Sequence, residues 1–216
     1  IFHGCSRLTS VTIPEGVTSI GGSAFYGCSN LTSVTIPEGV VSLGYFAFHG
    51  CSSLTSVTIP EGVPSIGDHV FYGCSKLTSV VIPEGVTSIG SSAFAGCSSL
   101  TSVTIPEDVT SIGSSAFSSC SGLTSVTIPE SVTSIDSAAF SGCDKLKHVY
   151  YGGSDLQWKE IEIGNYNYNL TDAIIHYAST HAHNVEHVPE KAASCTETGN
   201  LEYWRCLACG EYFTDE

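Results

Sequence analysis

The 216-residue chain has no methionine and few basic residues, with 7 lysines and arginines against 21 aspartates and glutamates. Its formal net charge of −14 repels phosphate backbones and anionic membrane surfaces, which argues against nucleic acid as a partner. No apolar run approaches the roughly 20 residues that a bilayer span needs. We therefore expect no membrane span in this chain.

A starting methionine is also missing. The chain begins with residues 1–5, Ile-Phe-His-Gly-Cys, which align with residues 24–28, Ala-Phe-Tyr-Gly-Cys, in the middle of a later unit. We therefore expect a fragment whose upstream repeats and any signal peptide lie outside it, and a parent protein longer at both ends. The compartment cannot be judged from a targeting segment.

The chain does contain a repeat with a spacing of 23 residues. Its most regular element is an Ile-Pro-Glu tripeptide, which occurs at residues 13–15, 36–38, 59–61, 82–84, 105–107 and 128–130. A unit this short has too little apolar surface to fold alone. Neighbouring units must stack and share one core, which predicts a solenoid.

Within one unit, the pattern predicts two short extended segments and a corner. Val34 and Ile36 alternate with polar residues, as in a strand with one buried face. The strand should end at Pro37, which has no N–H for a ladder and begins a Pro-Glu-Gly turn. A second extended piece follows at 40–43, and a tight turn at 47–51 should close the coil.

Stacked coils place equivalent residues about 4.8 Å apart, the distance between adjacent strands. One such column is Leu8, Leu31, Leu54, Leu77, Leu100, Leu123 and Leu146. Another is Phe2, Phe25, Phe48, Phe71, Phe94, Phe117 and Phe140. We interpret both columns as hydrophobic core and not as a cofactor site.

The motif Leu-x-x-Val-x-Ile-Pro, followed by Val-x-x-Ile-Gly-x-x-Ala-Phe-x-x-Cys, resembles the BspA-type leucine-rich repeat of bacterial and some protist surface proteins. The resemblance covers residues 1–152 in about six and a half copies. It implies a curved solenoid displayed outside the cell, with a role in adhesion or host contact. We therefore expect a mainly β fold: a right-handed β solenoid of leucine-rich repeats, a C-terminal cap and a small zinc-ribbon-like tail.

Seven of the ten cysteines occupy one column: Cys5, Cys28, Cys51, Cys74, Cys97, Cys120 and Cys143. Neighbouring Cα atoms about 4.8 Å apart do not forbid disulfides. Parallel stacking, however, points successive Cβ atoms in the same direction. We therefore expect buried free thiols that behave as small hydrophobes.

Candidate binding residues are those that change from copy to copy, because the constant positions build the coil. Aromatic residues gather at the corners of the early coils, where later coils carry alanine or serine: His3, Tyr26, Tyr45, Phe46, His49, His69 and Tyr72. Stacked rings with polar tips are typical of binding surfaces. The alternative is that the rings only cover the corner turn. A metal site from the three histidines is disfavoured, because no acid or thiol is fixed beside them.

After residue 152 the repeat ends. Residues 153–178 predict a cap, with a short helix beginning after Ser154 and a last strand at 173–177. Such a segment covers the apolar end of the array, and BspA-type arrays are closed by a similar tryptophan-containing cap. Residues 178–180 read as a linker into a small module at 181–216.

The tail at 181–216 contains Cys206 and Cys209 in a Cys-x-x-Cys-Gly knuckle. With Cys195 and His183 they form a candidate tetrahedral site for a structural Zn²⁺ ion. His181 and His187 compete for the fourth position, and a redox pair or free thiols are the alternatives to zinc. The tail also resembles a ribbon-like module of secreted proteins from gut Firmicutes.

Taken together, these features predict a non-catalytic, extracellular or cell-surface repeat module that binds a host or matrix protein or glycan. We expect it to act as a monomer. The alternatives are a spacer, or a binding fragment of a larger surface enzyme whose catalytic domain lies elsewhere. No nucleophile elbow, paired catalytic carboxylates or open metal site is visible in the sequence.

Overall fold

The chain divides into two compact units, Ile1–Ala178 and Ser179–Glu216, which are described separately below. A computed structural model describes residues 2–178, 185–188, 203–206 and 212–213.

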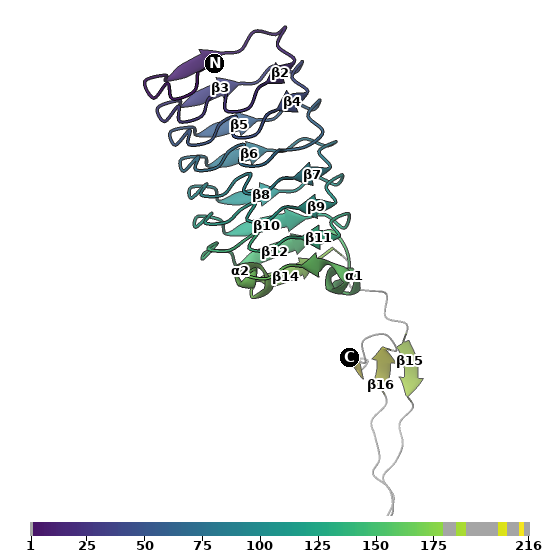
Figure 1. Ribbon diagram of the computed structural model, residues 1–216. Helices are drawn as coiled ribbons and strands as arrows, with labels where there is room; N and C mark the ends of the chain where they lie inside the picture. The colour runs from purple at the N-terminus through teal and green to yellow at the C-terminus, as the bar shows by residue number, and fades with distance from the viewer. Residues whose placement is uncertain (1, 179–184, 189–202, 207–211, 214–216) are drawn as a thin grey trace, which may run out of the picture. The chain divides into compact units, whose positions relative to one another are not determined.

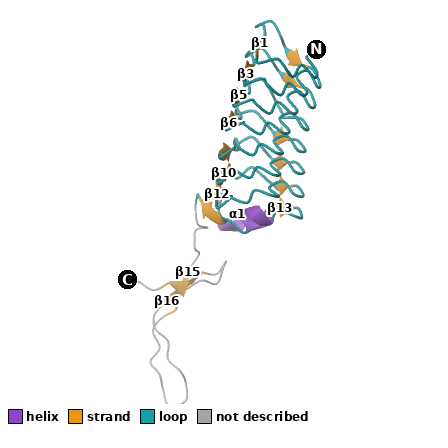
Figure 2. Cartoon of the chain, turned by 90° about the vertical axis from the view of Figure 1, so that its left-hand side faces the viewer, coloured by secondary structure: helices purple, strands orange, loops and turns teal. Residues whose placement is uncertain are grey.

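The first unit is a parallel β solenoid of about seven turns (Figure 1), as the 23-residue period predicts. One column holds β1 Ser10–Thr12, β3 Ser33–Thr35, β5 Ser56–Thr58, β6 Ser79–Val81, β8 Ser102–Thr104, β10 Ser125–Ile128, β12 His148–Tyr151 and β14 Ile174–Tyr177. The second column holds β2 Ser19–Ile20, β4 Ser42–Leu43, β7 Ser88–Ile89, β9 Ser111–Ile112, β11 Ser134–Ile135 and β13 Glu162–Ile163. Figure 2 shows the two columns from the side, joined by loop segments.

Register follows the repeat. Val126 of β10 lies opposite Val103 of β8 and Val149 of β12, so identical positions of successive coils stand side by side. Most strands of the first column end just before the Ile-Pro pair. This is expected because proline has no N–H to donate to the strand ladder. After each proline the chain turns: the N–H of Val40 donates to the carbonyl of Pro37 at 3.0 Å.

The corner is a series of tight turns that also bonds to the next coil. The N–H of Cys51 donates to the carbonyl of Phe48 at 3.1 Å within the coil, and the N–H of Phe48 donates to Val70 of the next coil at 2.9 Å. Backbone groups of the corner are therefore satisfied by the stack itself. The predicted tight turn at 47–51 is confirmed.

The second strand column is interrupted at the coil that contains Pro64. At this position of other coils, the N–H of Val41 donates to Thr18, and that of Thr87 donates to Pro64, both at 2.9 Å. Proline has no N–H to continue this series. At this coil the column has no named strand, and its pairing with the next coil is an isolated bridge between Ile66 and Ile89.

The predicted core columns are buried. From the second coil onward their side chains are at most 7% exposed, and the phenylalanine rings stack with centroids 5.1–5.4 Å apart. The cysteines of the column are free thiols, and six of them are buried. Each buried thiol donates to a phenylalanine carbonyl of the preceding coil, as Cys97 does to Phe71 at 3.3 Å. The prediction of free thiols is confirmed for this column.

The C-terminal end of the solenoid is covered by α1 Asp155–Glu160 and α2 Tyr168–Thr171, with β13 and β14 (Figure 1). Ser154 caps α1: its hydroxyl accepts the N–H of Gln157, whose side chain accepts the N–H of Ser154, a reciprocal capping box. The predicted helix and last strand are confirmed, whereas α2 was not predicted. None of the helices in the described residues combines the length and apolarity that a membrane crossing requires.

In the second unit the described residues form an antiparallel sheet of β15 Val185–Val188, β16 Tyr203–Cys206 and β17 Tyr212–Phe213. Cys206 is the last residue of β16. The other predicted zinc ligands, His183, Cys195 and Cys209, lie outside the described residues. The zinc-ribbon assignment therefore stays a prediction.

Candidate functional site: the aromatic corner surface

Four of the predicted binding residues form one continuous stack of rings at the corners of the first four coils. The centroids of His3 and Tyr26 are 4.8 Å apart, and the next two pairs, Tyr26 with His49 and His49 with Tyr72, are each 4.6 Å apart. The interplanar angles are 1–6°, so the rings are nearly parallel. The coil spacing imposes this geometry, because one ring is carried per coil. Histidine and tyrosine alternate, and their ring edges carry polar atoms.

A second, shorter stack lies beside the first. Phe46 and His69 have centroids 4.7 Å apart, and each also contacts the first stack, Phe46 at His49 and His69 at Tyr72, both at 5.7 Å. We call these six residues, His3, Tyr26, Phe46, His49, His69 and Tyr72, the aromatic corner surface. The sequence predicted its members, and the structure brings them into one contiguous cluster.

Both residues of the second stack are held in a strained backbone conformation. Phe46 has φ +60° and His69 has φ +57°, in the left-handed region that bulky residues rarely adopt. Serine occupies the equivalent position in three other coils, also with positive φ. The coil geometry thus requires this backbone everywhere, but only these two coils place a large ring there. The strain of about 1–3 kcal/mol that such a backbone costs is therefore a property of the coil, and the rings are what distinguishes these two coils.

The ring of His49 lies inside the stack, between Tyr26 and Tyr72. Its Nδ1 and that of His69 are buried and have no hydrogen-bond partner. Burial, and secondarily the neighbouring His69, lower the pKa of His49 below its ordinary value. The neutral form is therefore favoured, which suits a ring that is stacked on both faces.

Tyr45 is the one predicted residue that the structure sets apart. Its side chain is 63% exposed and it makes none of the described ring contacts with the corner surface. Its ring instead runs beside Gly67 of the next coil. There it lines a shallow groove with Val41 and Pro64, at the interruption of the second strand column.

The aromatic corner surface ends abruptly after Tyr72. The next residue in that column is Ala95, which is buried, followed by Ser118 and Ser141. Because alanine carries no ring, no described ring covers the far face of Tyr72, whose side chain is 40% exposed. The surface therefore has a step, with an accessible tyrosine ring at its edge.

Sequence reasoning missed a second group of rings at the other end of the solenoid, on β12 and β14. Nδ1 of His148 lies 3.0 Å from Nε2 of His176, and the ring of Tyr150 stacks on His176 at 4.8 Å. The signal was available in part, since outward positions that hold serine or threonine in earlier coils become His148 and Tyr150 here.

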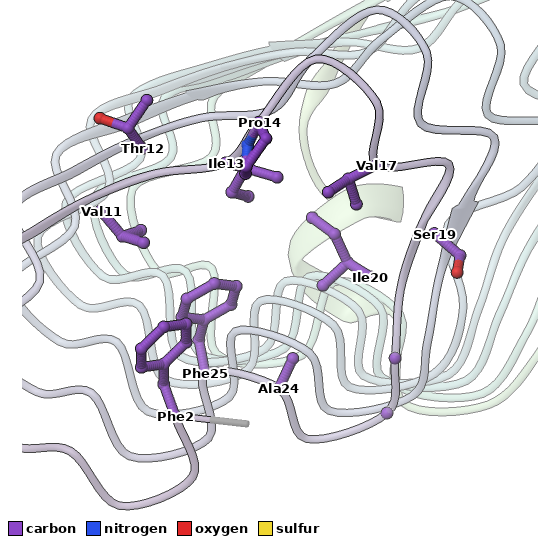
Figure 3. A pocket seen from close by; sticks show the side chains of 12 residues that line it. Phe2, Val11, Thr12, Ile13, Pro14, Val17, Ser19, Ile20, Ala24 and Phe25 are labelled. Atoms are coloured by element: carbon purple, nitrogen blue, oxygen red, sulfur yellow. The ribbon is translucent and has the colours of Figure 1, made fainter.

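An apolar cavity of about 370 Å³ lies at the N-terminal end of the solenoid (Figure 3). Its walls include Phe2, Val11, Ile13, Ile20 and Phe25. These residues occupy the core positions of the first two coils. We therefore interpret this cavity as the end of the hydrophobic core and not as a separate ligand site.

Across the part of the chain that the structure describes, no three histidine, cysteine or acidic side chains come together as a metal site. His49 and His69 lie between other rings instead, and the exposed His3 stacks on Tyr26. The aromatic corner surface thus offers stacking faces, ring edges and tyrosine hydroxyls, the chemistry of recognition.

Several solved structures share this fold. A T. pallidum leucine-rich repeat protein, TpLRR, is 31% identical with a TM-score of 0.66, covering 72% of this chain and 73% of that one. A leucine-rich repeat protein from Bacteroides ovatus is 27% identical (TM-score 0.54), with 79% of this chain and 63% of that chain covered. The pneumococcal vaccine antigen PcpA, 19% identical with a TM-score of 0.62, shares the fold over 80% of this chain and 42% of its own.

A comparison with curated proteins gave no match. The model of the BspA type leucine rich repeat region matches residues 1–120 and 64–192, in six copies. These matches span most of the chain and include the whole solenoid and its cap. The chain belongs to the BspA-type leucine-rich repeat family.

Proposed function

We propose that this chain is a non-catalytic, extracellular or cell-surface module that binds a protein or glycan through its aromatic corner surface. The observation that carries the proposal is the contiguous cluster of six rings, confined to the early coils of an otherwise uniform array. A structural cover for the corner would be needed in every coil. Later coils close the same corner with alanine and serine.

The turn itself does not need these rings. Phe46 and His69 occupy a left-handed backbone position that serine or alanine fills in the other coils with the same positive φ. Since the turn forms without a ring, contact with a partner accounts for the two large rings in adjacent coils.

The step at Tyr72 is the point where a partner would engage. Inner rings of the stack are covered on both faces, so they present only their edges. The uncovered face of Tyr72 lies above Ala95 and can accept one more flat group, either an aromatic side chain or the apolar face of a sugar ring. Tyr45, on the neighbouring column, offers a second exposed ring.

Surface display is supported by the family and by its neighbours. The family's repeats occur in surface proteins, and PcpA, which shares the fold, is a vaccine antigen. The net charge of −14 fits a molecule that does not engage nucleic acid.

The test is adhesion of the purified chain to epithelial cells and to immobilised matrix proteins. The test variant replaces Tyr26, Tyr45, Phe46, His49 and Tyr72 with serine. The control variant replaces exposed apolar residues elsewhere with serine, namely Val81, Tyr166, Tyr168 and Ile174. We expect adhesion to be lost in the test variant and retained in the control.

Two further treatments of the cell surface identify the chemical class of the partner. Periodate oxidation of the cell surface should abolish adhesion if the partner is a glycan, and protease treatment should abolish it if the partner is a protein. Equal adhesion of the test variant and the parent would remove the aromatic corner surface as the site. It would favour a spacer, or a fragment of a larger surface enzyme.

A further inference from the structure

The ring group at the C-terminal end of the solenoid differs from the aromatic corner surface in its chemistry. His148 and His176 bring two imidazole nitrogens together, Nδ1 of one and Nε2 of the other, at 3.0 Å. We propose that this pair is a surface site for a divalent transition-metal ion, copper(II) or nickel(II) first.

The separation of the two nitrogens matches a chelate. With metal–nitrogen bonds of about 2.0–2.1 Å, two ligands at 90° stand about 2.9 Å apart, and two at the tetrahedral angle about 3.3 Å apart. The observed 3.0 Å is close to the square-planar value. Copper(II) and nickel(II) prefer that geometry with nitrogen ligands, whereas zinc would require the pair to open slightly.

The rings are held by a rigid framework. β10, β12 and β14 pair in register, with His148 opposite Ile174 and Tyr150 opposite His176. The two histidines are therefore diagonal neighbours on adjacent strands. Tyr150 stacks on His176 at an interplanar angle of 16°, which limits rotation of that imidazole. Ligands restrained in this way lose less entropy when they bind.

Metal binding is compatible with the hydrogen bond that the pair makes without metal. In that bond one facing nitrogen carries the proton and the other accepts it. To bind a metal, the donor ring shifts to its other tautomer, so that both facing nitrogens present lone pairs and no net proton is released. The ion lies to one side of the line between the two nitrogens, so both imidazoles turn until their lone pairs point at it.

Charge and exposure favour the ion further. The chain carries a net charge of −14, which attracts cations to its surface. Side chains at the pair are accessible to solvent, so the remaining coordination positions are open to water or to a donor from a bound molecule. The site is thus an open, two-ligand chelate.

The experiment is a titration of the full ¹⁵N-labelled chain with Ni²⁺, monitored by nuclear magnetic resonance. Paramagnetic Ni²⁺ should broaden the amide signals of residues 147–151 and 174–177 at lower concentration than other signals of the solenoid. The variants His148→Ser and His176→Thr restore the residue types of the preceding coils, so folding should be preserved. Each should weaken the effect at least tenfold, about the loss caused by removing even an outer-shell partner.

Mn²⁺ serves as the matched control ion, because it is also paramagnetic but prefers oxygen ligands. It should leave these signals intact at the Ni²⁺ concentrations that broaden them. The proposal is overturned if Ni²⁺ leaves the signals unchanged, if the variants respond like the parent, or if Mn²⁺ acts equally. Because the variants keep every cysteine of the tail, loss of the effect assigns the ion to the histidine pair.

Discussion

Phe71 and Tyr72 are neighbours in the chain but belong to different columns, which allows the structural and recognition roles of the rings to be separated. Phe71 is fully buried and stacks between Phe48 and Phe94, with centroids 5.4 and 5.3 Å away. Replacing it with alanine removes a buried ring, which typically costs about 3–5 kcal/mol. Because Phe71 stacks on two rings, the expected loss lies at the upper end of this range, at about 5 kcal/mol.

Tyr72 is 40% exposed, and its ring contacts two neighbours, His49 at 4.6 Å and His69 at 5.7 Å. Its replacement with serine should lower the free energy of unfolding by only about 1–2 kcal/mol, the worth of two partly exposed ring pairs. Urea unfolding of the two variants and the parent, followed by circular dichroism, measures both losses. Comparable losses for Phe71→Ala and Tyr72→Ser would refute the argument, because Tyr72 would then be a structural cover.

Three further predictions concern the cysteines and His49. Burial raises the pKa of the Cys51 thiol to about 12 and that of Cys97 well above its ordinary value, so native alkylation with peptide mapping should label Cys5 and spare both until the chain unfolds. Because the fold favours neutral His49, the unfolded chain takes up a proton at higher pH. Stability should therefore fall as the pH drops below the ordinary histidine pKa of about 6.5, with the loss ending at the lower pKa of the folded state. The variant His49→Phe should flatten this part of the urea-midpoint profile between pH 7.5 and 5.5, and an unchanged profile would contradict the assignment. For the tail, we predict one tightly held zinc ion per chain, measured by elemental analysis. Replacing Cys206 and Cys209 with serine should remove this zinc. A disulfide between Cys206 and Cys209 in a chain without zinc would instead indicate a redox role.

The period of the sequence was sufficient to predict the solenoid, because every coil repeats the same physical requirements. Alternation of apolar residues identified the strands, and Pro37 and its equivalents marked where they end. The leucine, phenylalanine and cysteine columns follow from stacking alone, since equivalent residues must lie one strand spacing apart. The membership of the aromatic corner surface was predictable for the same reason.

The conformation of the rings was not predictable. Phe46 and His69 contact the first ring stack because their φ is positive, and no residue type in the motif predicts a positive φ there. Tyr45 follows the same pattern of variation, yet its ring packs toward Gly67. The histidine pair could not be found either. The repeat ends before β14, so the register that places His176 beside His148 is set by the cap and not by the period.

The central claim is that the aromatic corner surface recognises a partner and does not merely cover the fold. The most direct measurement shortens the ring stack one residue at a time, as Tyr72→Ser, then with His49→Ser, then with Tyr26→Ser, and records adhesion and the urea midpoint for each variant. We predict a stepwise loss of adhesion with only small shifts of the midpoint. Adhesion that stays at the parent level throughout, or that falls only in proportion to the folded fraction, would contradict the account.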